Sequence, residues 1–294
     1  MLMTLLKKIL KNKIAYLFIL PSFVAYFLFL IYPLIRTFML SFYKYKLNSF
    51  AFVGINNYIK LAADMVFRRA VWNTFLLTII AVPTIIIISI LIASFIINKS
   101  QKLRSLVMGI FYLPAVTSIV TICITWRWIY NTRYGILNSF LNFLGIESIN
   151  WLGDSKTALS TILVVLVYIS LGIPIILFTS AMGAVPKTYY EASDIDGAND
   201  FQKLWYITIP LIKPTTLYLA ITLTIGLFQT FVIVRLMTGG GPYYATTTIS
   251  FYLVQSAFYF SQYGFASTIG IFLLALIAGI TILQYKFLSS EVEY

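Results

Sequence analysis

Long runs without Asp, Glu, Lys or Arg make up most of this chain, and short charged links separate them. A helix needs roughly 20 apolar residues to cross the hydrocarbon core of a bilayer, which is about 30 Å thick. Six runs meet this length and predict membrane-spanning helices at about 14–36, 70–97, 105–128, 158–184, 212–235 and 264–285. The predicted fold class is an all-α integral membrane protein, a single domain over residues 1–294.

The last uncharged run is long enough for more than one span. Its first part, Thr238-Gly239-Gly240-Gly241-Pro242, cannot hold a regular helix because three glycines and a proline interrupt it. We therefore place the final span after it and expect 246–261 to form a helix packed at the outer surface. The links 41–69 and 131–156 are long enough for short surface helices, such as one over 134–145.

Lysine and arginine density sets the expected orientation, because cytoplasmic flanks carry more of these residues. The segments 1–13 and 98–104 are densely basic, whereas the links on the opposite side are long and more dilute. Both termini are expected in the cytoplasm, with 1–13 as a tail. The first apolar run is longer than the apolar core of a cleavable signal peptide, and five further spans follow it. We therefore expect it to be a membrane span and not a cleaved signal.

Composition agrees with a membrane protein: 60% of residues are hydrophobic and 10% are charged, against about 25% charged in soluble domains. The net charge of +12 lies beside apolar runs, where lipid headgroups explain it better than nucleic acid. The chain has no histidine, and its single cysteine, Cys123, lies in an apolar run. These absences exclude histidine-based catalysis, imidazole zinc sites and internal disulfides.

One link, 187–210, differs from the others because it holds four of the nine acidic residues, Glu191, Asp194, Asp196 and Asp200. Pro186 is suited to start a helix there, Gly197 to end it, and Asn199 or Asp200 to cap a second helix that runs to Pro210. The second helix is expected to have one apolar face, made of Phe201, Leu204, Trp205 and Ile209. On periodicity alone, this link could be an amphipathic interface segment that only joins two spans.

The residue string of this link adds a second interpretation. Glu191-Ala192-Ser193, Asp196-Gly197-Ala198 and Ile207-Thr208-Ile209-Pro210 resemble the Glu-Ala-Ala loop of permease subunits of binding-protein-dependent ABC importers, with Ser193 for Ala and Ile209 for Leu. The segments 52–58 and 238–242 look like the carbohydrate-importing branch, in the subunit similar to the larger permease of maltose-type importers. The resemblance covers nearly the whole chain, because six spans with this loop between the fourth and fifth are that family's core.

The resemblance implies that the link is a coupling helix that docks on a separate cytoplasmic ATPase. The residues it assigns to ATPase coupling are Glu191, Ala192, Ser193, Asp196, Gly197, Ala198, Ile207 and Pro210. It also implies a second permease, two ATPase subunits that hold ATP and Mg²⁺, an extracellular solute-binding protein, and a multi-pass location in a bacterial cell membrane. This chain would itself be non-catalytic and hold no cofactor, since none of its fifteen glycines precedes a lysine as a phosphate-binding loop requires.

Candidate solute contacts lie on the fourth and fifth spans. Thr222, Ile225, Gly226 and Gln229 share one helix face, and in the resembled family this face lines the solute cavity. The alternative is that the face packs on another span, since Gly and Thr favour close helix contacts. Tyr168 and Ser170 are further candidates, because tyrosine combines an apolar ring with a hydrogen-bonding group that suits a sugar.

The sequence leaves open the role of two arginines and the choice among several transport functions. Arg127 and Arg235 either attract an anionic solute or extend to the outer headgroups. The leading interpretation is an alternating-access pathway for a sugar or oligosaccharide. An ABC permease for a phosphate ester or an amino acid is an alternative, as is an ion-coupled secondary transporter. No Asp or Glu lies inside any predicted span, which argues against proton coupling, and a membrane enzyme lacks a catalytic constellation.

Overall fold

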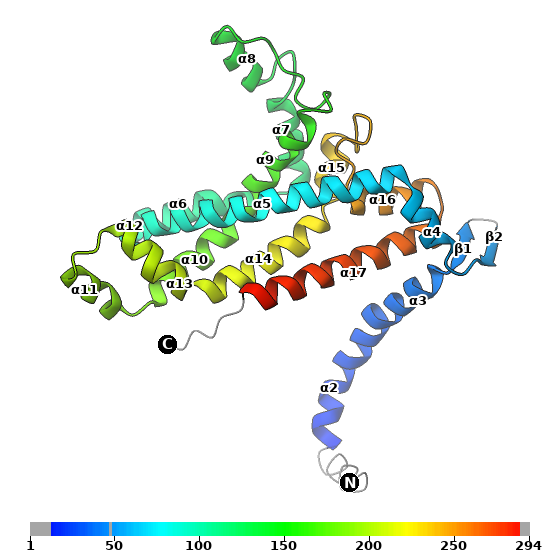
Figure 1. The fold of residues 1–294 in the computed structure, drawn as a ribbon, viewed down its shortest axis with the longest axis horizontal. Helices are drawn as coiled ribbons and strands as arrows, with labels where there is room; N and C mark the ends of the chain where they lie inside the picture. Colours follow the sequence, from blue (N-terminus) through cyan, green and yellow to red (C-terminus); the bar gives the residue numbers. More distant parts are fainter. Residues whose placement is uncertain (1–12, 47–48, 289–294) are drawn as a thin grey trace. The chain divides into compact units, whose positions relative to one another are not determined.

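The computed structural model describes residues 13–46 and 49–288 (Figure 1). Residues 1–12 of the expected cytoplasmic tail lie outside this part of the chain. The fold divides into two compact units. Unit 1 comprises Met1–Ala63 and Leu253–Phe272, and unit 2 comprises Asp64–Tyr252 and Leu273–Tyr294. Each unit is described by itself.

Unit 1 begins with one apolar helix that covers the first predicted span. It consists of α2 (Lys13–Tyr26), a short π-helix η1 (Phe27–Ile31) and α3 (Tyr32–Leu40). Its hydrophobic stretch, Leu17–Leu40, is 24 residues long and none of it is buried within the structure. The unit continues with β1 (Tyr43–Lys46), β2 (Ser49–Phe52), α4 (Asn56–Ala63), the π-helix η3 (Gln255–Tyr259) and the first part of α17 (Tyr263–Leu288).

The two strands form an antiparallel hairpin, with Tyr43 opposite Phe52, where the sequence predicted only helices. Tyr43 stacks on Phe50 with ring centroids 4.7 Å apart. The Asn57 side chain, at the start of α4, donates hydrogen bonds to the carbonyls of Ser41 and Tyr43 at 2.8 and 3.0 Å. Aromatic pairing and these bonds hold a two-stranded ribbon that is marginal alone.

Unit 2 contains most of the helices and all of the link after the fourth span. Its elements are α5 (Met65–Ile97), α6 (Gln101–Val116), α7 (Ile119–Ile129), α8 (Ile136–Phe143), α9 (Ala158–Ser170), α10 (Gly172–Ala184), α11 (Lys187–Ile195), α12 (Asp200–Lys203), the π-helix η2 (Leu204–Thr208), α13 (Ile209–Leu211), α14 (Lys213–Phe228), α15 (Val232–Met237) and α16 (Ile249–Val254). The last part of α17 completes it. The short helix expected over 134–145 is confirmed as α8.

The core of unit 2 lies where α5 packs along α10 and α14 and near α9. Its fully buried side chains include Ile85, Ile162, Val165 and Ile175. Burying a side chain of this size stabilises the fold by about 1.5–3 kcal/mol. Gly172 permits a close approach of α10 to α6, because a Cβ there would lie 2.6 Å from the carbonyl oxygen of Phe111.

The predicted third, fourth and fifth spans are not straight helices. Two pairs, α6 with α7 and α9 with α10, bend by 99° and 46°, and the segment 200–211 meets α14 at 69°. The described residues hold three unbroken helices long enough to cross a membrane, or up to six spans if each bent pair counts as one. Pro174 and Pro214, near the starts of α10 and α14, remove backbone donors where two bends occur.

The prediction of a surface helix over 246–261 is wrong in its burial. Only α16 and the π-turn after it are helical, and Thr246, Thr247 and Thr248 are fully buried. The reason lies in α14, which ends at Phe228 and leaves carbonyls without helical partners. Thr248 and Ser250 donate to the carbonyls of Thr230 and Phe228 at 2.7 and 3.1 Å, so burying this segment satisfies the broken helix end.

Candidate functional site

The link after α10 folds locally as its residues predict. Pro186 precedes α11, and Gly197 follows it with φ +75°. The Ala198 N–H donates to the Ser193 carbonyl at 2.9 Å, and the Gly197 N–H donates to the Asp194 carbonyl at 3.2 Å. This pair of bonds is a Schellman motif, which satisfies the last carbonyls of the helix and needs a left-handed residue at the glycine position.

The second helix of the link starts with a capping box. The Asn199 side chain accepts from the Gln202 N–H at 2.9 Å, and the Gln202 side chain accepts from the Asn199 N–H at 2.8 Å. Asn199 is therefore the cap. The segment continues through a π-turn, η2, so the expected single apolar face is not formed: Phe201 and Trp205 are exposed and stack on each other at 6.3 Å.

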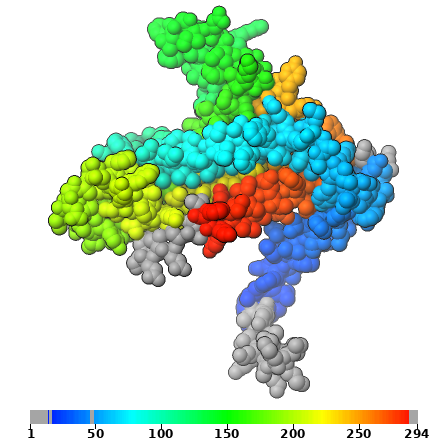
Figure 2. All heavy atoms as spheres, in the orientation of Figure 1, coloured from blue at the N-terminus to red at the C-terminus, as the bar shows by residue number. Residues whose placement is uncertain are grey.

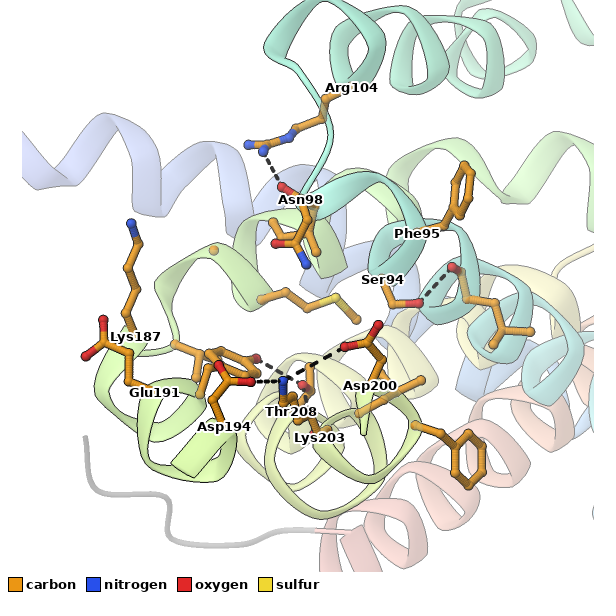
Figure 3. A pocket seen from close by; sticks show the side chains of 18 residues that line it. Ser94, Phe95, Asn98, Arg104, Lys187, Glu191, Asp194, Asp200, Lys203 and Thr208 are labelled. Carbon is orange, nitrogen blue, oxygen red and sulfur yellow. Dashed lines mark hydrogen bonds and ion pairs between the residues drawn. The ribbon is translucent and has the colours of Figure 1, made fainter. Parts of the chain in front are cut away.

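Two side-chain contacts fix α11 over the second helix (Figure 3). Lys203 pairs with Asp194, and Tyr190 shares a hydrogen bond of 2.9 Å with Thr208. The hydrogen bond to Asp194 raises the pKa of Lys203 above its ordinary value, since it favours the charged amine. The link therefore forms one rigid piece at the end of unit 2 (Figure 2).

The predicted coupling residues do not all face outward. Glu191, Ala192, Asp196, Gly197 and Pro210 are exposed, while Ala198 and Ile207 are half-buried. Ser193 is 8% exposed and donates to the Tyr190 carbonyl at 2.7 Å. The Ser193 side chain is therefore not available for the expected contact with an ATPase, because its hydroxyl is buried and bonds to the backbone of α11.

The residue missing from the sequence-based set is Ile195, the last residue of α11, whose side chain is 88% exposed. A single exposed apolar residue is ordinary by itself, so the position of Ile195 at the end of α11, between two acidic residues, makes it a candidate contact residue. The signal was present in the sequence as an apolar residue between Asp194 and Asp196. Beside α11 lies a cleft of about 990 Å³, between the link and the ends of α5 and α10, and Glu191, Asp194, Lys203 and Arg104 are among its lining residues.

A second cavity, of about 610 Å³, lies among the bent helices α6, α7, α9, α10, α14 and α15. Thr222, Gly226 and Gln229 line it from α14 and its end, and Ser170 lines it from α9. Among the residues that the structure describes, no Asp, Glu, Lys or Arg lines it. We call this cavity the neutral pocket. Its polar groups are hydroxyls and one amide, which can donate and accept hydrogen bonds without introducing a charge.

Two predicted solute residues do not line the neutral pocket. Ile225 lies outside it because it is turned toward another side of α14, and the Tyr168 ring packs edge-on against Trp126 at 5.4 Å. Tyr218 and Thr117 do line it and were not predicted. Tyr218 lies one turn before Thr222 on the same helix face, so the spacing could have found it, whereas Thr117 is placed by the bend after α6.

Neither candidate arginine lines the neutral pocket. Arg127 instead donates to the carbonyl of Leu236 at 3.3 Å. On the far face of α14, Thr224 is 2% exposed and accepts a hydrogen bond of 2.8 Å from the Gln284 side chain on α17. The polar residues of α14 therefore divide between two roles, with Thr222 and Gln229 facing the pocket and Thr224 joining two helices.

Comparison with known proteins shows the family of this chain. The family described as "Binding-protein-dependent transport system inner membrane component" matches residues 61–293. The arabinooligosaccharides transport system permease protein of Bacillus subtilis (strain 168) is 32% identical over 278 residues, covering 94% of this chain and 88% of that protein. The trehalose/maltose transport system permease protein of Thermococcus litoralis is 32% identical over 278 residues, covering 93% of each chain.

Solved structures share the fold. A chain of a bacterial alginate ABC transporter, solved in complex with an alginate pentasaccharide-bound periplasmic protein, superposes with a TM-score of 0.84 at 23% identity and covers 95% of both chains. A chain of a bacterial ABC transporter involved in the import of the acidic polysaccharide alginate gives 0.83, also at 23% identity, over 97% of this chain.

Proposed function

Because this chain belongs to the family of binding-protein-dependent transport system inner membrane components, we propose that it forms one half of a membrane pathway for a sugar or oligosaccharide. It is a permease subunit of an ABC importer and a multi-pass membrane protein. The relatives named for arabinooligosaccharides and for trehalose and maltose support the carbohydrate assignment. A second permease would form the other half, and an extracellular binding protein would deliver the solute.

The coupling role is supported mainly by the rigid link, in which Ile195 is exposed at the end of α11. The apolar side chain would fill a hollow on an ATPase subunit, and the exposed Glu191 and Asp196 would form charge-assisted hydrogen bonds at its rim. ATP and Mg²⁺ would be held by the ATPase subunits alone. Six spans, with both termini in the cytoplasm, would put this link on the same side as those subunits.

Cross-linking from two matched positions tests this role. Ile195 and Phe143 are both exposed apolar residues, 88% and 85% exposed, but Phe143 lies on α8, on the side expected to face outward. The native Cys123 is buried, so Ile195→Cys and Phe143→Cys each add one accessible thiol. We expect the first to cross-link to an ATPase in gently solubilised membranes and the second not to. Cross-linking from neither position, with no ATPase or second permease co-purified, would refute the importer assignment.

The neutral pocket supports an uncharged carbohydrate as the solute. Moving a carboxylate or phosphate out of water costs several kcal/mol per ion unless a counter-charge awaits it, and the described residues that line the pocket offer none. Hydroxyls of an uncharged sugar would instead pair with Thr222, Gln229 and Ser170. The chain of the alginate transporter shares the fold, so the fold alone does not assign the solute class.

Paired substitutions on α14 test the pocket. Gln229→Ala removes an amide from the pocket just after α14, whereas Ile225→Ala shortens a side chain of α14 that lies outside the pocket. We expect Gln229→Ala to lower uptake of the cognate sugar into proteoliposomes while ATP hydrolysis without solute stays unchanged. Equal effects of the two substitutions would show that the pocket is not the pathway.

A further inference from the structure

The loop 238–248 lies between α15 and α16 (Figure 1), and buried hydrogen bonds fix its base. The Asn73 side chain on α5 donates to the carbonyls of Tyr244 and Thr247, each at 3.0 Å. Thr246 and Thr247 are fully buried and donate to the carbonyls of Gly241 and Gly240 at 2.7 and 2.9 Å. The base of this loop is therefore part of the packed structure of unit 2.

The tip of the same loop presents two tyrosines on an unusual backbone. Tyr243 and Tyr244 have φ values of +49° and +62°, a region that bulky residues rarely occupy and hold only when their surroundings impose it. The Tyr243 side chain is 93% exposed, so it gains almost no burial within this chain. Glycine or asparagine would hold the same turn with less strain, so packing within the chain does not explain the ring.

The position of the Tyr243 ring suits a protein partner better than a free sugar. Solute sites are concave, and Tyr243 lines none of the cavities described above. An aromatic ring that stands out from a rigid base matches the anchors at the centres of protein interfaces, which insert into a hollow on the partner. Tyrosine can be such an anchor because it has few rotatable bonds and a hydroxyl that keeps one hydrogen bond.

The charges beside the loop indicate the chemistry of that partner. Arg69 and Lys156 line a cavity of about 280 Å³ together with Ala245 of the loop. Among the described residues, neither basic side chain takes part in an ion pair. Two cations beside the base of this loop would attract an acidic surface on a partner that docks there and accelerate its approach.

We propose that Tyr243 is a docking anchor for the extracellular solute-binding protein, and that Arg69 and Lys156 receive an acidic rim beside the hollow that takes the ring. The inference rests on the proposed function, which requires such a partner and places this loop on the outer side. Lipid is a poorer occupant, because an interfacial tyrosine needs no strained backbone. A second permease is poorer too, because two cations line the cavity next to this loop and membrane helices associate through small and apolar residues.

The test uses the assembled importer in nanodiscs with its own purified, solute-loaded binding protein. ATP hydrolysis is measured as the binding-protein concentration is raised. We expect Tyr243→Ala to raise the half-maximal concentration at least tenfold, with unchanged basal and maximal rates. Tyr134→Ala is the matched control, since Tyr134 is also an exposed tyrosine, 61% exposed, but lies on ordinary backbone between α7 and α8; it should change the value less than twofold.

Two further variants separate docking from folding. The double variant Arg69→Glu with Lys156→Glu should raise the half-maximal concentration and remove most of its dependence on salt. Tyr243→Gly removes both the ring and the strain, so it should weaken docking while the thermal unfolding temperature stays equal or rises. A clear fall in that temperature would mean that the ring stabilises the fold, and the proposal would be overturned.

The outcomes distinguish this inference from the proposed function. If the binding protein stimulates the unaltered importer and Tyr243→Ala responds identically, the anchor is refuted while the importer assignment stands. If the unaltered complex shows no stimulation, the importer assignment itself fails. Loss of the second permease from the Tyr243→Ala complex would place the ring at the permease interface and also overturn the proposal.

Discussion

Gly197 offers a sharp test of the coupling role, because the chain contains a matched twin of its turn. Gly197 has φ +75° after α11, and Gly145 has φ +77° after α8. After α8, the Ile146 N–H donates to the Leu141 carbonyl at 2.9 Å and the Gly145 N–H to the Asn142 carbonyl at 3.0 Å. Both glycines therefore close a Schellman motif, and a Cβ at either would meet nothing within 4 Å.

The two turns should respond alike to strain and differently in function. An L-residue in the left-handed region costs about 1–2 kcal/mol, and open space at both sites means that conformational strain is the only cost. That energy changes the population of the native turn by a factor of about 5–30. At Gly197 the displaced turn would misplace Asp196 and Ile195, whereas the same change at Gly145 affects only the end of α8, outside the link.

The assay is the ratio of solute imported to ATP hydrolysed in proteoliposomes. We expect Gly197→Val to lower this ratio several-fold and Gly145→Val to leave it nearly unchanged, although both should lower thermal stability by similar amounts. Gly197→Asn should restore most of the ratio, because asparagine tolerates the left-handed region. Undiminished coupling in Gly197→Val, at normal assembly with the ATPase, would refute the role of this turn.

Three other predictions concern contacts described above. Asn199→Ala removes the cap of α12 and should destabilise the link by about 1 kcal/mol, seen as faster proteolysis of the link. Asn73→Ala leaves two carbonyls of the loop 238–248 without their donor and should lower stability by about 1–3 kcal/mol for each buried group left unpaired, measured by thermal unfolding in detergent. The raised pKa of Lys203 means that its stabilising pair with Asp194 persists below the ordinary lysine pKa and is lost as pH rises through the higher folded-state value. The ratio of solute imported to ATP hydrolysed should therefore change little between pH 6 and 9. Lys203→Met should lower this ratio over the whole range. A steep loss of the ratio in the unaltered protein within that range would contradict the role of the Lys203–Asp194 pair.

Local signals predicted the link well because helix ends are determined by a few neighbouring residues. Pro186, Gly197 and Asn199 each act on the backbone within about one turn, so their positions in the sequence were sufficient. The exposure of Ser193 was not predictable in the same way. It depends on which side of α11 faces the second helix of the link, where Tyr190 of α11 bonds to Thr208, and that is set by packing between segments.

The helix bends and the hairpin at 43–52 were not predicted from the sequence. Hydropathy counts apolar residues but is the same for a straight helix and a bent one, so the 99° turn after α6 left no signal in composition. The hairpin at 43–52 did leave one, since Tyr43 and Tyr45 alternate with Lys44 and Lys46 in the period of a strand. A search for uncharged runs passes over such alternation.

The rigid link joins two arms of nearly equal length. From the link, α10 runs back to Pro174 and α14 runs forward to Thr222, and both residues line the neutral pocket. At about 1.5 Å per residue, each arm is about 14–15 Å long. A tilt of about 10° imposed at the link would move each pocket wall by about 2.5 Å by that geometry. Because the two arms are nearly equal in length, a small rotation of the link would open or close the neutral pocket by similar movements of α10 and α14. Neither helix would need to bend further.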